Sequence, residues 1–311
     1  MPELPEIEIV KRSLFKKING AKIVNVKINN KNLRYKITHA LPKKLINEKI
    51  LKISRRSKYL IFHFKNKLLL AHLGMSGKFL IIRSKDKKMF KTSFYYDLDI
   101  LAKHNHIHFI LNNGLELIYN DVRRFGFFKL FENIKLKEII YLKKLGPEPF
   151  SVLFCIKYVQ KFIKNRKKNI KNLLMDQTFV SGLGNIYVNE ALFLSKIHPL
   201  RQCSNLERKS IKNLIYNIRK VLKIAINQGG SSIRDFKNVY GKSGNFQQFF
   251  NVYGQENKNC SRLSCKGKIK KISISNRSSF YCNVCQNLLL LTHMNEKDIH
   301  SPLSCQILNL R

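Results

Sequence analysis

Residues 260–285 read CSRLSCKGKIKKISISNRSSFYCNVC and contain four cysteines in two pairs, Cys260 with Cys265 and Cys282 with Cys285. Zinc prefers four thiolates in a tetrahedron, and two knuckles joined by a β-hairpin can supply them. A segment this small has little apolar core, so metal binding would supply its folding energy. The pattern therefore predicts a zinc ribbon with one structural Zn²⁺. Four residues separate the first pair, two more than is usual, which makes Cys260 the least typical ligand.

The segment between the two cysteine pairs is strongly basic. A hairpin in this segment would present a row of cations to phosphate groups, namely Lys266, Lys268, Lys270, Lys271 and Arg277. A solvated basic strand has the same composition, so the charge alone leaves both interpretations open.

The chain as a whole is also basic. Its 59 Lys and Arg residues against 19 Asp and Glu give a formal net charge of +40. This charge favours a polyanionic partner, with nucleic acid as the first candidate and an acidic membrane surface as the second. The abundance of Ile, Lys and Asn indicates that part of the charge reflects compositional drift. No stretch approaches the roughly 20 apolar residues that span a bilayer, and the acidic start differs from a signal peptide, so we expect a cytosolic protein.

The hydrophobic pattern divides the chain into regions. Residues 1–18 are expected to form a helix, because apolar side chains recur there at helical spacing. Alternating and β-branched runs then predict a β-sandwich, with strands at 22–28, 59–64, 68–72, 106–111 and 115–119. Helical periodicity follows from about residue 134 to 230 and breaks at Val180–Asn185, where Asn185 is expected to cap the next helix. A loop rich in Gly and Ser follows at 231–248.

The N-terminus offers a nucleophile. Pro2 follows Met1 directly, and removal of Met1 would expose a secondary amine. An α-amino group titrates near pH 8, so a useful fraction is a free base at neutral pH and can form a Schiff base with an electrophilic carbon. Glu3 and Glu6 lie close enough in sequence to transfer protons. Acidic residues at a helix start also suit the helix dipole, so the residues alone leave this role open.

The start MPELPEIE, at residues 1–8, resembles that of the bacterial formamidopyrimidine-DNA glycosylase family, also called 8-oxoguanine DNA glycosylases. The resemblance covers residues 1–286 and continues in order through RRSKYL (55–60), HLGMSG (72–77), DVRRFG (121–126), LGPEP (145–149), GLGNIY (182–187), QGG (228–230), VYG (252–254) and NRSSFYC (276–282). One such motif alone would be weak, but this many dispersed matches are specific.

The resemblance implies an enzyme that acts on damaged double-stranded DNA as a monomer in the bacterial cytosol, near the nucleoid. It would remove oxidised purines and then cleave the abasic site by β,δ-elimination. The implied fold class is α+β and multidomain. A catalytic β-sandwich domain with its N-terminal helix would span 1–132, and a helix-two-turn-helix domain 133–249, with a lesion-recognition loop at 231–244. A zinc-finger domain would span 250–286, and the tail at 287–311 extends beyond the usual end of the family.

The resemblance also implies catalytic roles for single residues. Pro2 would be the nucleophile, Glu3 would shuttle protons, and Glu6 would support the site. Lys58 and Arg277 would contact the phosphates beside the lesion.

Further matched residues would bind DNA, namely His72, Met75, Arg123, Phe125, Lys171 and Asn185. Met75, Arg123 and Phe125 match side chains that enter the duplex when a base is everted, and such wedges offset the lost stacking. Apolar packing in a core would be the alternative for Met75 and Phe125.

Three other functions stay open from the sequence. Endonuclease VIII, which acts on oxidised pyrimidines, shares Pro2, Glu3 and the zinc finger, but Leu4 and the matched wedge residues favour the purine branch. A decayed, non-catalytic DNA-binding protein fits the charge and the tail, whereas the retained site residues argue against it. A zinc-ribbon RNA-binding protein would leave the N-terminal match unexplained.

Overall fold

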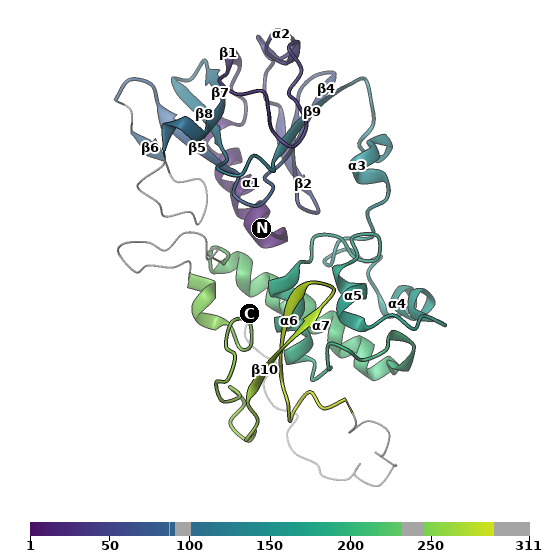
Figure 1. Ribbon diagram of the computed structural model, residues 1–311. Coiled ribbons are helices and arrows are strands. Elements are labelled where there is room, and N and C mark those ends of the chain that lie inside the picture. Colours follow the sequence, from purple (N-terminus) through teal and green to yellow (C-terminus); the bar gives the residue numbers. More distant parts are fainter. Residues whose placement is uncertain (87, 91–100, 232–244, 289–311) are drawn as a thin grey trace, which may run out of the picture.

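The computed structural model describes residues 1–86, 88–90, 101–231 and 245–288, and Figure 1 shows how their helices and strands are arranged. Antiparallel strands form two sheets in the N-terminal region. The five-stranded sheet has the order β1 (Ile23–Ile28), β7 (Asn105–Leu111), β8 (Leu115–Asn120), β5 (Lys78–Arg83) and β6 (Met89–Phe90). The four-stranded sheet has the order β2 (Lys52–Arg56), β3 (Tyr59–His63), β4 (Lys67–His72) and β9 (Phe127–Glu132).

The two sheets pack face to face around one apolar core. Phe62 on β3 meets Phe79 on β5 with ring centroids 5.9 Å apart, and Tyr119 on β8 meets Phe128 on β9 at 4.8 Å. The apolar stripe of α1 (Leu4–Ile18) joins the same core, and α2 (Leu41–Leu45) adds two buried leucines. The predicted β-sandwich with an N-terminal helix is therefore confirmed.

The predicted strands agree with the observed ones to within one residue at each end. Asn112-Asn113-Gly114 forms the hairpin turn between β7 and β8, and Gly114 has a φ of +74°, which glycine adopts without strain. Strands β2, β5, β6 and β9 were not predicted. The N-terminal helix begins at Leu4, because Glu3 is its N-cap residue.

The middle of the chain is helical, as expected. It contains α3 (Ile140–Lys143), α4 (Ile156–Ile163), α5 (Ile170–Met175), α6 (Asn185–Leu194) and α7 (Arg208–Asn227). A second apolar core lies among α4 to α7, and α1 lies between the sheets and this helical region, against α7 (Figure 1). The N-cap residue of α6 is Gly184, so the expected cap by Asn185 is wrong. Among the helices that the structure describes, none has the length and apolar character needed to cross a bilayer.

The C-terminal module is the expected β-hairpin, formed by β10 (Ile269–Ile274) and β11 (Arg277–Cys282). Its small apolar cluster includes Val252 and Phe280 and packs against Phe193 of α6. Together the three parts confirm the predicted α+β multidomain class. Most of the predicted lesion-recognition loop, at 232–244, and most of the predicted tail, at 289–311, lie outside the described residues.

Candidate active site and metal centre

The start of α1 lies where the β-sandwich meets the helical region, and it forms the centre of the candidate site. Pro2 is buried, and the Glu3 backbone N–H donates to Glu6 Oε2 at 2.8 Å in a capping box. The Glu3 carboxylate extends to the other region, where Oε1 accepts the N–H of Ile186 at 3.1 Å. Glu3 thus satisfies a free N–H in the first turn of α6, which explains why Asn185 does not cap that helix.

Two glycines allow this close approach. A Cβ atom at Gly184 would lie 2.2 Å from Glu3 Cδ, so a larger residue there would displace the carboxylate. Gly182 has a φ of +93° and accepts a hydrogen bond from the Leu4 N–H at 3.0 Å. The break in helical periodicity at 180–185 is therefore the surface on which the N-terminus rests.

Burial dominates the protonation of this centre. It raises the pKa of Glu3 to about 7, while Lys58 opposes the shift and Glu6 adds to it. Burial lowers the pKa of Lys58, which Glu3 and Glu6 oppose and Arg277 reinforces. Glu3 Oε2 is buried without a hydrogen-bond partner among the described residues. A carboxyl group with a pKa near neutrality and an unoccupied oxygen can both donate and accept a proton.

Glu6 is fixed from several sides. Its Oε1 accepts hydrogen bonds from the Tyr187 hydroxyl, from the Ser231 N–H at 2.9 Å and from Ser231 Oγ at 3.0 Å. These bonds connect α1 with α6 and with the last described residue before 232–244. No local sequence pattern indicated Tyr187 or Ser231 as partners of Glu6.

Asn185 and Lys171 converge on the hairpin that carries Arg277. Asn185 Nδ2 and Lys171 Nζ both donate to the Ser278 carbonyl, at 3.0 Å and 2.9 Å. Burial lowers the pKa of Lys171 to about 7, Arg277 adds to this shift, and Glu3 opposes it. A pocket of about 430 Å³ opens here, and its lining includes Glu3, Asn185 and Arg277.

The three predicted wedge residues lie on two adjoining loops. Met75, between β4 and β5, lines the same pocket. Arg123 and Phe125, between β8 and β9, are exposed, and the Arg123 guanidinium carbon lies 4.7 Å from the Phe125 ring centroid. The Arg123 N–H donates to Ser76 Oγ at 3.0 Å, which joins the two loops. Phe125 is therefore a surface residue rather than part of a core.

His72 is packed rather than free. Its ring stacks on Phe127 with centroids 5.5 Å apart, and its Nδ1 accepts the Gly74 N–H at 3.0 Å. Burial lowers the pKa of His72 to about 4, and Lys58 and Arg34 add to the shift. The imidazole is therefore neutral at pH 7 and carries its proton on Nε2, so it could donate one hydrogen bond but would not act as a cation.

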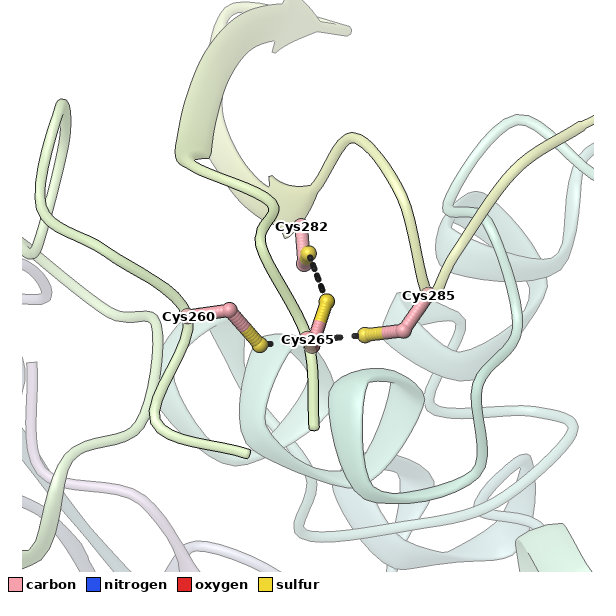
Figure 2. Close-up of side chains that lie close together, drawn as sticks. All are labelled: Cys260, Cys265, Cys282 and Cys285. Carbon is pink, nitrogen blue, oxygen red and sulfur yellow. Dashed lines mark hydrogen bonds between the residues drawn. The ribbon is translucent and has the colours of Figure 1, made fainter. Parts of the chain in front are cut away.

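The four cysteines of the ribbon come together as the spacing predicts (Figure 2). Their sulfur atoms all lie within 4.8 Å of one another, with Cys265 and Cys282 at 3.6 Å and Cys260 and Cys285 at 3.9 Å. Thiolates around a tetrahedral zinc, with bonds of about 2.3 Å, are about 3.8 Å apart. The donor set and its spacing fit a closed site for one metal ion, and the longer first knuckle still brings Cys260 into it.

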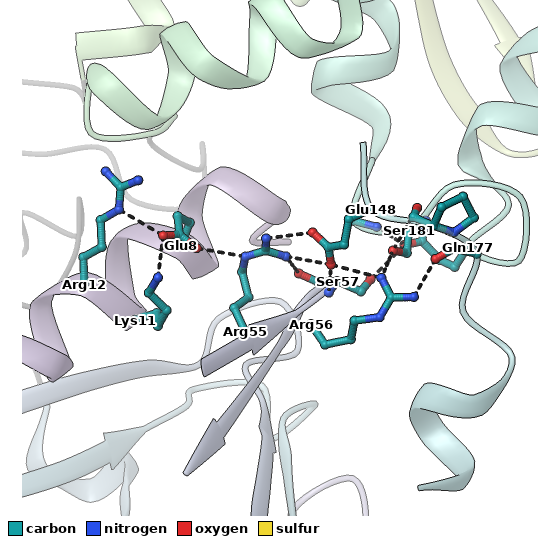
Figure 3. Close-up of polar contacts among 12 residues, drawn as sticks. Glu8, Lys11, Arg12, Arg55, Arg56, Ser57, Glu148, Gln177 and Ser181 are labelled. Atoms are coloured by element: carbon teal, nitrogen blue, oxygen red, sulfur yellow. Dashed lines mark hydrogen bonds and ion pairs between the residues drawn. The ribbon is translucent and has the colours of Figure 1, made fainter. Parts of the chain in front are cut away.

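Glu148 is a residue of the site that sequence reasoning missed (Figure 3). Its carboxylate accepts from Arg55 Nη2 at 2.7 Å, from Arg56 Nη1 at 3.2 Å and from the Ser57 N–H at 2.6 Å. Ser57 has a φ of +55° and directly precedes Lys58. The available signal for this acidic residue was the pair of adjacent arginines in RRSKYL, because partly buried arginines need an acidic partner.

Comparisons with known proteins identify the family of the chain. The model of the formamidopyrimidine-DNA glycosylase N-terminal domain matches residues 1–128, and that of the formamidopyrimidine-DNA glycosylase H2TH domain matches residues 145–237. A formamidopyrimidine-DNA glycosylase of Bartonella tribocorum is 45% identical and aligns over 92% of this chain and 100% of its own. One from Rickettsia massiliae is 44% identical, over 92% and 97%.

Solved structures with the same fold include Lactococcus lactis Fpg in complex with DNA. A complex of a mutant with Fapy-dG-containing DNA has a TM-score of 0.79 and 37% identity, and covers 92% of this chain and 100% of that one. A complex with DNA that contains an abasic site has a TM-score of 0.78 and 37% identity, and covers 92% and 99%. The matched domains, the identity over most of both chains and the shared fold place this chain in the formamidopyrimidine-DNA glycosylase family.

Proposed function

We propose that this protein is a bifunctional DNA glycosylase and abasic-site lyase of base excision repair that removes oxidised purines from duplex DNA. The observation that carries the proposal is the position of Glu3, beside the buried Pro2 and in a pocket with Arg277 and Asn185. Family membership supports the activity, and the DNA complexes of Lactococcus lactis Fpg support damaged DNA as the partner.

The reaction would begin at Pro2 after Met1 has been removed. The neutral amine attacks C1′ of the damaged nucleotide, a nitrogen–carbon bond forms, and the glycosidic bond breaks as the purine leaves with its electron pair. Glu3, with a pKa of about 7, would protonate the opening sugar and later accept a proton. The resulting Schiff base draws electrons from C2′, so the 2′ proton is lost and the 3′ phosphate is eliminated, followed by the 5′ phosphate.

The remaining site residues would hold the DNA in place. Lys58 and Arg277 would contact the phosphates beside the lesion, and Asn185 and Lys171 would hold the strand that carries Arg277. Met75, Arg123 and Phe125 would fill the space left by the everted base, and a neutral His72 would donate from Nε2. Glu6 would support Glu3 through α1.

The four thiolates would hold a single Zn²⁺ in a structural role, because they leave no open coordination position. We further propose the domain boundaries given by the sequence, namely 1–132, 133–249 and 250–286, with an additional tail. A monomer that acts in the cytoplasm, and is held near the nucleoid by its charge of +40, fits the proposed substrate.

Covalent trapping tests this function. The purified protein is incubated with borohydride and a duplex that carries 8-oxoguanine opposite cytosine, and a covalent protein–DNA band is expected because borohydride reduces the Schiff base. The band should disappear in a Pro2→Gly variant whose amine has been blocked by acetylation. Trapping with thymine glycol but not with 8-oxoguanine would assign the protein to the pyrimidine branch. No band with either lesion, in protein that lacks Met1 and contains zinc, would indicate a non-catalytic DNA-binding protein.

A further inference from the structure

The first metal knuckle extends a side chain to a neighbouring helix. The two cysteines of this knuckle enclose Ser261 to Ser264, and Arg262 leaves the knuckle toward the end of α6. Its Nη2 donates to the Phe193 carbonyl at 2.8 Å and to the Leu194 carbonyl at 3.1 Å. The guanidinium carbon lies 4.8 Å from the Phe193 ring centroid, which adds a cation–π contact.

This contact matches the chemistry of a helix end. The last carbonyl groups of a helix lack partners within it and carry partial negative charge, so a cation there is favourable. A planar guanidinium can meet two carbonyls and a ring together, which an ammonium group cannot. Leu263, the next residue in the knuckle, is fully exposed, so the tip of the knuckle docks through its arginine and not through its apolar side chain.

The backbone of Arg262 belongs to the metal site. The Cys265 N–H donates to the Arg262 carbonyl at 3.0 Å, and Arg262 lies two residues after Cys260. A change in the spacing of the thiols would therefore move the arginine as well. Gln286, beside the second knuckle, accepts the Cys282 N–H at 2.9 Å and donates to the Ile197 carbonyl at 2.8 Å. Both knuckles thus hold the C-terminal end of α6 and the turn after it.

The opposite end of α6 is part of the candidate active site. The helix has 10 residues and a length of about 15 Å, given a rise of about 1.5 Å per residue. At its first turn the Ile186 N–H donates to Glu3, and Asn185 donates to the Ser278 carbonyl. Because a short helix moves as a rigid body, a shift at Leu194 would also displace the first turn of α6, which contacts Glu3.

We propose that Arg262 is a positioning residue that couples metal occupancy of the ribbon to the placement of α6, and so to Glu3 and Asn185. The two extra residues of the first knuckle would serve this contact. The inference rests on metal binding by the four thiolates, as proposed above, and the stoichiometry of zinc in the purified full-length protein tests that step separately.

The experiment compares three variants of the full-length protein. Arg262→Met keeps the apolar stem but removes the charge and the hydrogen bonds. Arg262→Lys keeps a positive charge but lacks the planar guanidinium group. Arg166→Met is the matched control, because the guanidinium carbon of Arg166 lies 4.2 Å from the Phe162 ring centroid, in a contact of the same kind within the helical region. The measurements are zinc release to a chromogenic chelator, and hydrogen exchange of the amides of 185–197 with zinc bound and after its removal.

Arg262→Met should release zinc about tenfold faster than the unchanged protein, which is the usual scale for loss of a residue that orients metal ligands. With zinc still bound, the α6 amides of this variant should exchange several-fold faster than those of the unchanged protein, and removal of zinc from the unchanged protein should have the same effect. Arg262→Lys should fall between the two, and Arg166→Met should match the unchanged protein. Faster zinc release with unaltered exchange in α6 would overturn the coupling, as would Arg262→Met behaving like the control. Unchanged protein that binds no zinc would overturn the metal site itself.

Discussion

The helical region is joined to its two neighbours by different means. Its joint with the β-sandwich is a network of charged hydrogen bonds, in which Glu148 accepts from Arg55, Arg56 and Ser57 (Figure 3). Its joint with the ribbon consists of a small apolar cluster and a few polar contacts, and the ribbon itself contains four close thiols that could hold a metal ion (Figure 2). A region with its own core can rely on charged contacts at its edge, whereas the ribbon has almost no core, and we expect it to depend on the proposed metal for its folding.

Both joints reach the residues that surround Glu3. Arg56 of the first joint donates to Ser181 Oγ at 2.7 Å, just before the glycines that contact Leu4 and Glu3, and the ribbon holds α6, whose first turn Glu3 caps. We therefore expect the site to form only when both joints are closed. The two joints thus bring residues from distant parts of the chain to Glu3. A buried acid with a raised pKa, such as Glu3, is typical of a functional site.

Metal removal should have the largest effect and separate the two joints. Chelation is expected to abolish hydrogen-exchange protection at 255–288 and to weaken it several-fold at 185–197, while the other amides of 1–86 and 101–230 keep theirs, because binding of structural zinc contributes on the order of 10 kcal/mol in small modules. Affinity for a damaged duplex should fall at least about 100-fold, since the ribbon carries Arg277 and several lysines. Protection that persists in the ribbon after chelation would show that its apolar cluster suffices.

Breaking the charged joint should have a smaller and different effect. Glu148→Gln removes the carboxylate that Arg55 and Arg56 share and leaves Arg55 with Glu8 alone, and we expect a loss of about 2–3 kcal/mol in the free energy of unfolding. Single-turnover excision should fall at least about tenfold, because the turn before Lys58 loses its anchor, while zinc content stays the same.

Glu132→Gln is the control for this change. Glu132 pairs with Lys44 on the exposed surface, and such pairs contribute little, so stability and excision should not change measurably. Equal behaviour of the two variants, measured by chemical denaturation and excision assays, would mean that the β-sandwich joint does not depend on its charges.

Sequence reasoning succeeded where the physics is local. Alternating residues predicted strands such as β3 and β4, and cysteine spacing predicted the ribbon, because each pattern is complete within a few residues. It failed where a partner is distant. Glu3 lies 183 positions from Ile186, and Glu148 lies 92 positions from Arg56, so neither the cap of α6 nor the charged joint could be inferred from local pattern. The roles of Met75 and Arg123 came from family resemblance alone.

The smallest predicted effect concerns the acid at which the two joints meet. Burial raises the pKa of Glu3 to about 7, above its ordinary 4.5, so the folded state binds an extra proton between these pH values. The favourable contribution of protonated Glu3 is complete below about pH 4.5 and is lost as the pH rises through 7. Glu3→Gln should therefore unfold with a free energy about 1–3 kcal/mol higher than the unchanged protein at pH 8, with little difference near pH 4.5.

Glu8 offers a control for Glu3, because its substitution should change stability at pH 8 in the opposite direction. The two variants together compare the charged joint with the site that it supports. Burial alone would raise the pKa of Glu8, but Lys11, Arg12 and Arg55 outweigh it and lower the pKa. Its contribution is therefore present above the ordinary pKa of 4.5 and lost as the pH falls below it, so Glu8→Gln should lower stability at pH 8. Urea denaturation of both variants across this range measures the two signs. If Glu3→Gln also lowers stability at pH 8, the Glu3 carboxylate is better compensated by Lys58 than its burial implies, and Glu3 belongs with the charged joint.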